Sequence, residues 1–322
     1  MHGKGHYSMS KDIDILALGT AYVDINCTNF PFTDGLQAET EVAGEQYELA
    51  PGGAALNFAR VCVGLGLSAT FIGKVGVDRM GDIATDSITK SGVTPRLIRD
   101  PKALTNLSLN LVNDQGKSVM AVVGNAKHRF TAEEMWQELE PLLPRAKYVI
   151  LGGAFKLENL RPIFKQIAKV AGQNDTKLVF DHGRFAIRAS EADRTILREF
   201  ATLADYYLPS RDEFLALWGV DTIAAGLELF NNSTTTVVVK DSAHGAHTLM
   251  GSTCVTIPAF RAQVVNTVGA GDSFNAGLIS ALDTGLSMTD AIRFACATAA
   301  LKISQSDPIT TAMVQHFLNK QG

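Results

Sequence analysis

Residues 265–272 read Val-Asn-Thr-Val-Gly-Ala-Gly-Asp, and this stretch decides how the rest of the 322-residue chain is interpreted. It ends an apolar segment and precedes an apolar-periodic stretch, 273–282, which predicts a turn leading into a helix. Gly269 and Gly271 allow positive φ and a close approach of backbone to a ligand. The N–H groups at a helix start point toward one spot and favour an anion there. Asp272 adds a carboxylate at the same spot.

Two interpretations of this turn follow from the residues alone. A phosphate cradle beside a general base is what phosphoryl transfer to a hydroxyl group requires. Alternatively, the glycines form an ordinary turn and Asp272 is the N-cap of the helix. The remainder of the sequence distinguishes the two.

Composition and charge narrow the function classes. The chain is 46% hydrophobic and 19% charged, which is typical of a folded soluble protein and fits one large α/β domain. The formal net charge is −4 and no basic stripe stands out, so nucleic acid is not expected as a partner. Spanning a bilayer takes ~20 consecutive apolar residues, and no stretch approaches that length, so no membrane association is expected.

The spacing of the cysteines and the residues at the N-terminus indicate where in the cell the protein is expected. The cysteines are far apart and form no Cys-x-x-Cys motif, so reduced thiols in a cytoplasmic protein are expected. They are Cys27, Cys62, Cys254 and Cys296. The first residues lack the apolar segment of a signal peptide, and residues 1–11 are predicted to be a disordered tail. Metal binding by His2 and His6 is the alternative for that tail.

Apolar runs alternate with amphipathic stretches along most of the chain. This rhythm predicts an α/β fold with a doubly wound, mostly parallel sheet flanked by helices on both faces. The predicted strands are 14–18, 69–75, 148–151, 178–181, 206–208 and 236–240, with a hairpin pair at 246–250 and 254–257. The predicted helices are 54–65, 79–91, 157–171, 191–203, 212–218, 223–231, 272–283 and 289–304.

Two segments break this rhythm. Residues 106–123 alternate polar and apolar side chains around the turn Asn-Asp-Gln-Gly, which predicts a β-hairpin. Residues 28–49 are polar, carry few helix signals and favour further antiparallel strands. We therefore expect a single domain, 1–322, with a small sheet from about 25–50 and 105–125 that covers a site as a lid.

Several conspicuous residues fall at the ends of predicted strands or, in one case, just before the first predicted helix. In open α/β sheets, ligands bind beyond the carboxyl ends of the strands, so these residues are expected to gather at one edge. They are Asp24, Gly52, Gly53, Asp181, Ser210, Lys240 and the turn 269–272.

Three stretches together resemble motifs of one family. Residues 266–274 resemble a C-terminal signature usually written Asp-Thr-x-Gly-Ala-Gly-Asp, and residues 52–59 resemble Gly-Gly-x-x-x-Asn-x-Ala. Residues 73–81 lie between them and resemble Gly-x-Val-Gly-x-Asp-x-x-Gly. All three are motifs of the ribokinase-like carbohydrate kinase family, and the resemblance extends from about residue 13 to about residue 304.

The resemblance implies a fold and a reaction. The family fold is a doubly wound α/β domain with a small β-sheet lid. Its members move the γ-phosphate of ATP to a hydroxyl group of a sugar, sugar phosphate or nucleoside, with Mg²⁺. We expect a carbohydrate kinase acting on a small sugar or sugar derivative. An adenosine-like or pseudouridine-like nucleoside kinase is the alternative, and a catalytically weak sugar- or nucleotide-binding protein is the third candidate.

The resemblance also implies roles for the phosphoryl-transfer and acceptor residues. Asp272 would be the catalytic base, and the amides of Val268, Gly269, Ala270 and Gly271 would form the anion hole. The acceptor would be held by Asp24, Gly52, Gly53 and Asn57. The alternatives are an ordinary loop acid for Asp24 and a solvent-facing Asn57 after a glycine turn.

On the nucleotide side the resemblance implies contacts from Lys240, Gly245, Val268 and Ser210. Glu213 would be tied to Mg²⁺ through water. Alternatively, Ser210 and Glu213 form a helix capping box, and both roles are compatible. A surface position is the alternative for Lys240.

Three residues depart from the family pattern. Asn266 stands where most relatives carry Asp, Ser210 where Asn is usual, and Ser242 where Gly is usual. The acid replaced by Asn266 helps hold a monovalent cation in some members, so weak or absent K⁺ activation is expected. The edge of the lid could pair with a second subunit by strand addition, which would give a homodimer.

Overall fold

The computed structural model describes residues 10–32, 41, 43–44, 46–115, 118–153, 158–265, 267–305 and 308–321. The expectations for most of the N-terminal tail, including His2 and His6, and the expectation for Asn266 lie outside the described residues.

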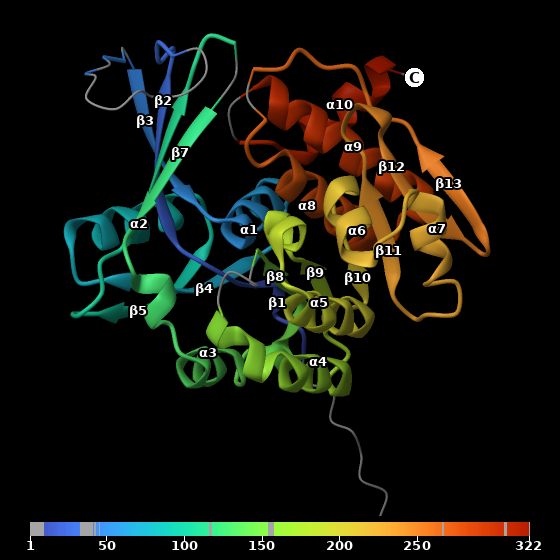
Figure 1. The fold of residues 1–322 in the computed structure, drawn as a ribbon, viewed down its shortest axis with the longest axis horizontal. Helices are drawn as coiled ribbons and strands as arrows, with labels where there is room; N and C mark the ends of the chain where they lie inside the picture. Colours follow the sequence, from blue (N-terminus) through green and yellow to red (C-terminus); the bar gives the residue numbers. More distant parts are fainter. Residues whose placement is uncertain are drawn as a thin grey trace, which may run out of the picture.

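The described residues form a nine-stranded sheet with the order β13-β12-β11-β10-β9-β8-β1-β4-β5 (Figure 1). Neighbours from β11 to β5 pair in parallel, and β12 and β13 are antiparallel additions at one edge. The strands are β1 (Ile13–Leu18), β4 (Ala69–Gly76), β5 (Thr94–Asp100), β8 (Ala146–Gly152), β9 (Lys177–Asp181), β10 (Tyr206–Tyr207), β11 (Thr236–Lys240), β12 (Ala246–Met250) and β13 (Thr253–Ile257). The predicted doubly wound, mostly parallel sheet is confirmed.

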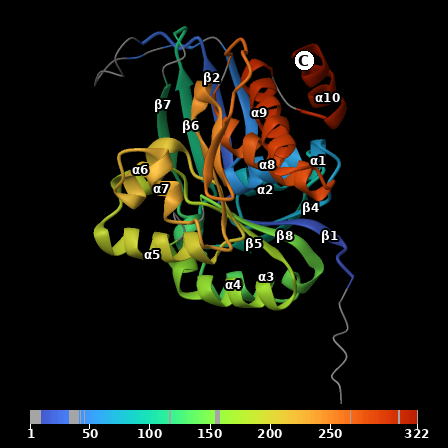
Figure 2. The same cartoon turned by 90° about the vertical axis from the view of Figure 1, so that its right-hand side faces the viewer.

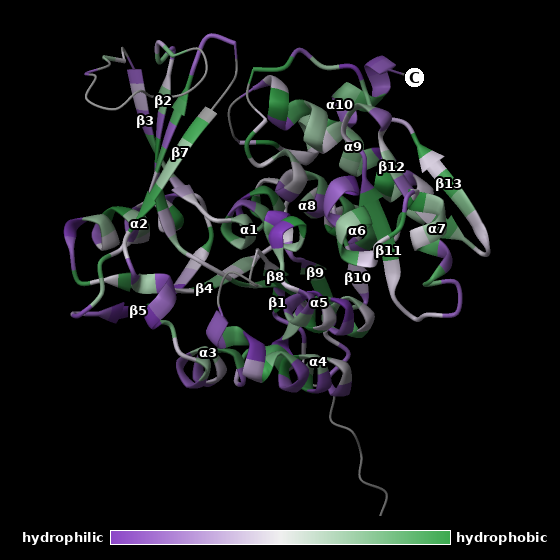
Figure 3. Cartoon of the chain, in the orientation of Figure 1, coloured by the Kyte–Doolittle hydropathy of each residue, from purple (hydrophilic) through white to green (hydrophobic). Residues whose placement is uncertain are grey.

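Helices cover both faces of this sheet (Figure 2). One layer contains α1 (Ala54–Gly64), α2 (Arg79–Lys90), α8 (Ala270–Asp283), α9 (Met288–Ser304) and α10 (Thr311–Gln321). The other contains α3 (Ala132–Leu139), α4 (Phe164–Gln173), α5 (Glu191–Leu203), α6 (Arg211–Trp218) and α7 (Ile223–Glu228). Successive side chains of β1 point to opposite faces of the sheet. Ile15 packs against the first helix layer and Leu16 against the second. A strand buried on both faces explains why β1 is apolar from Ile15 to Leu18, whereas Asp14 near its start is partly exposed and accepts a hydrogen bond from Ser68. Hydropathy follows the same plan, because the middle of β11 (237–239) is hydrophobic while the outer helices carry hydrophilic stripes (Figure 3).

A second, four-stranded sheet has the order β3-β2-β6-β7. Its strands are β2 (Tyr22–Thr28), β3 (Gln46–Gly52), β6 (Asn106–Val112) and β7 (Ser118–Val123). β2 pairs antiparallel with β3, and β6 with β7, whereas β2 and β6 run parallel. The small sheet therefore consists of two hairpins joined through parallel neighbours, close to the predicted ranges 25–50 and 105–125.

Several elements differ from the sequence-based expectations. β5, α3 and α10 were not predicted. β5 carries Pro95, Arg96 and Arg99 on an edge strand, where proline and charge are tolerated and weaken the strand pattern. α3 starts with a capping box between Thr131 and Glu134, a signal that the sequence does contain. The predicted helix 157–171 includes a 3-10 segment, Glu158–Ile163, before α4 begins.

Two predictions from composition can be compared with the fold. All four cysteines are free thiols, with Cys62 and Cys296 buried and Cys27 and Cys254 partly exposed. Within the described residues, no helix combines the length and the apolar character needed to cross a membrane.

Candidate active site

The turn at 268–271 starts α8. The helix begins at Ala270, two residues before the predicted start, and Gly269 is its N-cap with φ 76°. The Ser273 amide donates to the Gly269 carbonyl at 2.9 Å and closes the first turn. Asp272 therefore lies inside the first turn, and its interpretation as the N-cap is wrong. A residue with a side chain is strained at the φ of Gly269, which explains the glycine there.

Asp272 faces α1 and is partly buried. Asn57 Nδ2 donates to Asp272 Oδ2 at 3.0 Å, so the two residues singled out from separate motifs meet in space. Burial raises the pKa of Asp272 to about 6, against the opposing effect of the Asn57 hydrogen bond. The nearby charges of Asp181 and Glu213 also raise this pKa, and that of Lys240 lowers it. A carboxylate with this pKa suits a general base working near neutral pH.

A buried polar network supports α8 from the sheet below. Lys240 Nζ at the end of β11 donates to Asp181 Oδ2 at 2.8 Å, to Leu208 O at 2.6 Å and to Asn275 Oδ1 at 3.1 Å. Asn275 Nδ2 also donates to Asp181 Oδ2 at 2.7 Å. Burial opposes ionisation of Asp181, yet Lys240 holds its pKa below the usual value. The network joins β9, β11 and α8 beneath the turn.

Sequence reasoning found part of this network. It placed Asp181 and Lys240 at the strand-end edge, and it missed Asn275, which lies one helical turn after Asp272. The position of Asn275 inside the apolar α8 was the available signal, because a buried amide requires hydrogen-bond partners.

Asp24 lies on β2 of the small sheet, opposite Ser108 of β6. Burial raises the pKa of Asp24 to about 6, while the Ser108 hydrogen bond and the charge of Arg60 lower it. A Cβ on Gly52 would lie 2.1 Å from Asp24 Oδ2, and one on Gly53 would lie 2.1 Å from Thr20 O. The paired glycines therefore allow β3 to approach Asp24 and the chain to turn into α1.

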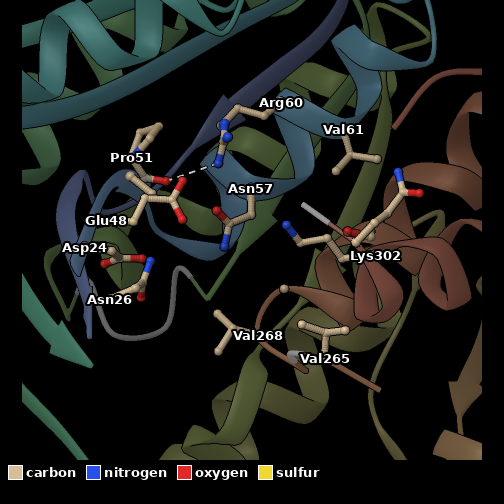
Figure 4. A pocket seen from close by; sticks show the side chains of 14 residues that line it. Asp24, Asn26, Glu48, Pro51, Asn57, Arg60, Val61, Val265, Val268 and Lys302 are labelled. Atoms are coloured by element: carbon tan, nitrogen blue, oxygen red, sulfur yellow. Dashed lines mark hydrogen bonds between the residues drawn. The ribbon is translucent and has the colours of Figure 1, made fainter. Parts of the chain in front are cut away.

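A pocket of about 220 Å³ opens between the small sheet, α1, the α8 turn and the end of α9 (Figure 4). Asp24 of β2 and Asn57 of α1 both line it, from two sides. Arg60 of α1 and Lys302 of α9 also line it, and sequence reasoning did not identify them. The described residues that line it are Asp24, Asn26, Glu48, Ala50, Pro51, Asn57, Arg60, Val61, Val265, Val268, Gly269, Ser273, Lys302 and Gln305.

The remaining predicted residues lie beyond β10 and β11. Glu213 is buried, and its Oε2 accepts the Ser210 amide at 2.9 Å, as in the expected capping box. The negative charge of Glu213 is one of the causes that raise the pKa of Asp272. Gly245 has φ 96°, and a Cβ there would lie 2.0 Å from Ile257 O. Ser242 replaces the usual glycine and still adopts the left-handed φ of 49°.

The site thus combines a glycine turn at the start of α8, a carboxylate held by Asn57 and a polar pocket, all on an α/β fold. A sequence model of the pfkB family carbohydrate kinases matches residues 13–314, and the chain belongs to that family.

Curated relatives agree with this assignment. Ribokinase of Bacillus subtilis is 24% identical over 290 residues, covering 90% of this chain and 92% of that protein. The 5-dehydro-2-deoxygluconokinase of B. subtilis is 24% identical over 311 residues, covering 93% and 92%. Among solved structures, an E. coli protein described as ribokinase II, in complex with ATP and Mg²⁺, superposes with a TM-score of 0.80. The superposition covers 96% of this chain and 99% of that one at 20% identity.

The predicted family, fold and general activity are thereby confirmed. The protein is a carbohydrate kinase, a phosphotransferase of the ribokinase-like fold.

Proposed function

We propose that this kinase moves the γ-phosphate of ATP to a hydroxyl group of a small sugar or sugar derivative, with Asp272 as the general base. The observation that carries this proposal is the Asn57–Asp272 hydrogen bond. It holds the carboxylate between the polar pocket and the start of α8, where a hydroxyl and a phosphate would meet.

The transfer step uses residues of this chain in three ways. Asp272 accepts the proton of the acceptor hydroxyl as that oxygen forms its bond to the γ-phosphorus. The bond from the γ-phosphorus to the bridging oxygen breaks, and ADP leaves with the electron pair. The amides of Val268, Gly269, Ala270 and Gly271 and the dipole of α8 stabilise the negative charge on the moving group.

Acceptor binding is the proposed role of Asp24, Gly52, Gly53 and Asn57. An ionised Asp24 accepts hydrogen bonds from two neighbouring hydroxyl groups of the acceptor. The backbone at Gly52 and Gly53 comes close to the bound molecule, because neither residue has a side chain. The small sheet acts as a lid that excludes water, so that ATP is not hydrolysed instead.

The proposed site for ATP and Mg²⁺ lies on the side of the 268–271 turn that faces away from the acceptor pocket. Lys240, Gly245, Ser210 and Val268 border the proposed ATP site. Within the described ranges, no cluster of three or more His, Cys, Asp or Glu side chains forms a metal cage. Mg²⁺ keeps several waters and binds largely through phosphate oxygens, so a single carboxylate such as Glu213, acting through water, fits it. When bound, Mg²⁺ neutralises charge on the phosphates.

The pocket favours a sugar over a nucleoside. None of the described residues that line it is aromatic, whereas a nucleoside base requires a stacking surface. Carboxylates, amides and cationic side chains dominate the lining and suit a molecule with many hydroxyl groups. Ribokinase and 5-dehydro-2-deoxygluconokinase, the two relatives described above, have names that denote sugar-type acceptors, which supports a sugar as the acceptor here.

We also propose a homodimer formed through the outer face of the small sheet. Tyr47, Leu49 and Val123 lie on the face opposite Asp24 and are 73%, 43% and 60% exposed. Exposed apolar side chains grouped on a sheet are typical of an interface. A cytoplasmic location is proposed from the free thiols.

The test is ADP release from Mg·ATP across a panel of sugars, sugar acids, sugar phosphates and nucleosides, with Asp272→Asn as the control. Turnover with one sugar-type acceptor that the variant loses supports the proposal. Turnover with nucleosides alone identifies the alternative activity. If no acceptor reacts while ligands still raise the melting temperature, the binding-protein candidate replaces the kinase.

A further inference from the structure

Two lysines lie against the turn at the start of α8, one beside each glycine. A Cβ on Gly271 would lie 3.7 Å from Lys240 Nζ, and a Cβ on Gly269 would lie 3.5 Å from Lys302 Cε. The turn is therefore bordered by positive charge at both ends, in addition to the helix dipole.

The two lysines have different surroundings. Lys240 donates to Asp181, Leu208 and Asn275, and its charge is balanced by the Asp181 carboxylate. Lys302 lines the acceptor pocket, and its side chain extends from α9 toward Asn57 (Figure 4). The position of a Cβ on Gly269 is also 3.9 Å from Asn57 Nδ2. Lys302 thus lies on the side of the turn from which the acceptor hydroxyl approaches.

A second donor lines the same pocket. Ser273 Oγ is buried and has no hydrogen-bond partner within the described residues. Ser273 follows Asp272 and sits one helical turn above Gly269. An ammonium group and an unpartnered hydroxyl beside an N-terminal helix turn together favour an anion there.

α9 holds Lys302 in a fixed relation to the turn. The Val265 amide donates to Ile303 O at 2.7 Å, which ties the segment before the turn to the last turn of α9. α8 and α9 also pack closely, because a Cβ on Gly277 would lie 2.7 Å from Thr298 Oγ1. A cation fixed in place before the reaction stabilises developing charge without the cost of reorganisation.

We propose that Lys302 is a catalytic residue whose ammonium group binds the phosphoryl group during its transfer, at the Gly269 end of the anion hole. This inference rests on the proposed kinase function. Lys240 supports the turn from below, and Lys302 contacts the moving group from the acceptor side.

The test compares nucleotides with and without a γ-phosphate. Wild type, Lys302→Met, Lys302→Arg and Arg293→Met are titrated calorimetrically with ADP and with the non-hydrolysable ATP analogue AMP-PNP, each with Mg²⁺. Arg293 lies on α9 and packs over the Phe260 ring, so its variant controls for loss of one charge from the same helix. We expect Lys302→Met to weaken AMP-PNP about tenfold while ADP affinity is unchanged, since one charge-assisted bond is lost. Lys302→Arg retains most of the preference for AMP-PNP, and Arg293→Met behaves as wild type.

Kinetics provides the second readout. With an acceptor from the panel above, Lys302→Met lowers kcat about 10²-fold and leaves the acceptor KM unchanged. A raised acceptor KM with unchanged kcat overturns the proposal, because Lys302 then binds an anionic acceptor instead. Equal weakening of both nucleotides, or of neither, also overturns it. If the wild type binds neither nucleotide, the proposed kinase function itself fails. If the wild type binds both and the Lys302 variants show none of the expected effects, only the role of Lys302 fails.

Discussion

The site has two ends, and at each end burial raises the pKa of one carboxylate to about 6. Asp24 lines the pocket at the small-sheet end, and Asp272 lies at the α8 end, hydrogen-bonded to Asn57 of the pocket lining. Their supports differ. Asp272 is held by Asn57 and stands on α8, which rests on the buried network of Asp181, Lys240 and Asn275. Asp24 stands on a small sheet whose opposite face exposes large apolar side chains such as Tyr47.

This difference indicates that the two ends have different functions, with phosphoryl transfer at the α8 end and acceptor binding at the small-sheet end. A fully paired buried network is rigid and specifies one arrangement, which suits the groups that act on phosphorus. A sheet with a solvent-facing side has fewer packing constraints, so its residues can vary with the acceptor while the chemistry stays the same. Changes at the α8 end should therefore affect kcat and stability, and changes at the small sheet should affect acceptor affinity.

The largest effect is expected for Asp272→Asn. The amide keeps the shape of the side chain but cannot accept the hydroxyl proton, so kcat should fall about 10³-fold, within the range for a general base. Steady-state ADP release measures it, and Asp82→Asn on the exposed surface of α2 is the matched control. Unchanged ADP affinity and melting temperature would show that the loss is chemical. A loss below tenfold would contradict the assignment of the base.

Lys240→Met tests the support under α8. It leaves the buried Asp181 carboxylate without its cation, which should lower the free energy of unfolding by about 3 kcal/mol. Urea unfolding followed by tryptophan fluorescence measures this loss. The double variant Lys240→Met/Asp181→Asn should recover most of it, because no uncompensated charge remains. Equal stabilities of the single and double variants would mean that the pair does not carry charge in the fold.

The sequence predicted the fold and most of the candidate site, for a physical reason. Buried parallel strands are largely apolar, which leaves recognisable runs in the sequence. Glycines with positive φ or close contacts cannot be replaced, which leaves clear signals at Gly53 and Gly269. Those patterns located Asp24, Asn57 and Asp272.

The remaining features depend on tertiary contacts that no local pattern encodes. Lys302 lies in the last turn of a helix, where lysine is common, and only the packing of α9 on α8 brings it to the turn. The pairing of Lys240 with Asp181 required knowing that β9 and β11 flank β10. β5 was missed because an edge strand tolerates the charges that hide its pattern.

The pH dependence separates the two carboxylates. In the proposed mechanism the free enzyme acts with both Asp272 and Asp24 ionised, and burial raises both pKa values to about 6. Below pH 6 each group takes up a proton, so log kcat/KM should fall with a limiting slope of about two per pH unit. In Asp24→Asn the slope should fall to about one, since only Asp272 still titrates. A slope of two in that variant would exclude ionised Asp24 from acceptor binding.

Gly52→Ala tests the close approach of β3 to Asp24. The added methyl group would lie 2.1 Å from the carboxylate and must displace it. We expect the acceptor KM to rise about tenfold with kcat little changed. This pattern is typical when the lost interaction stabilised the ground state and the transition state equally. Gly172→Ala is the matched control, because a Cβ there meets nothing within 4 Å. A fall in kcat instead would show that the small sheet positions the reacting groups and would remove the contrast between the two ends.

The smallest effect is expected from K⁺. Asn266, two residues before Val268 in the sequence, supplies a neutral amide where most members of the family carry Asp, and one negative charge is therefore missing from this motif. A monovalent cation is attracted less strongly without that charge, so replacing Na⁺ by K⁺ should leave kcat nearly unchanged. Asn266→Asp restores the charge and should make the rate respond to K⁺, which an ADP-release assay at constant ionic strength detects. Strong K⁺ stimulation of the wild type would mean that other groups at the α8 end hold the cation, and that this end is more variable among relatives than its buried network indicates.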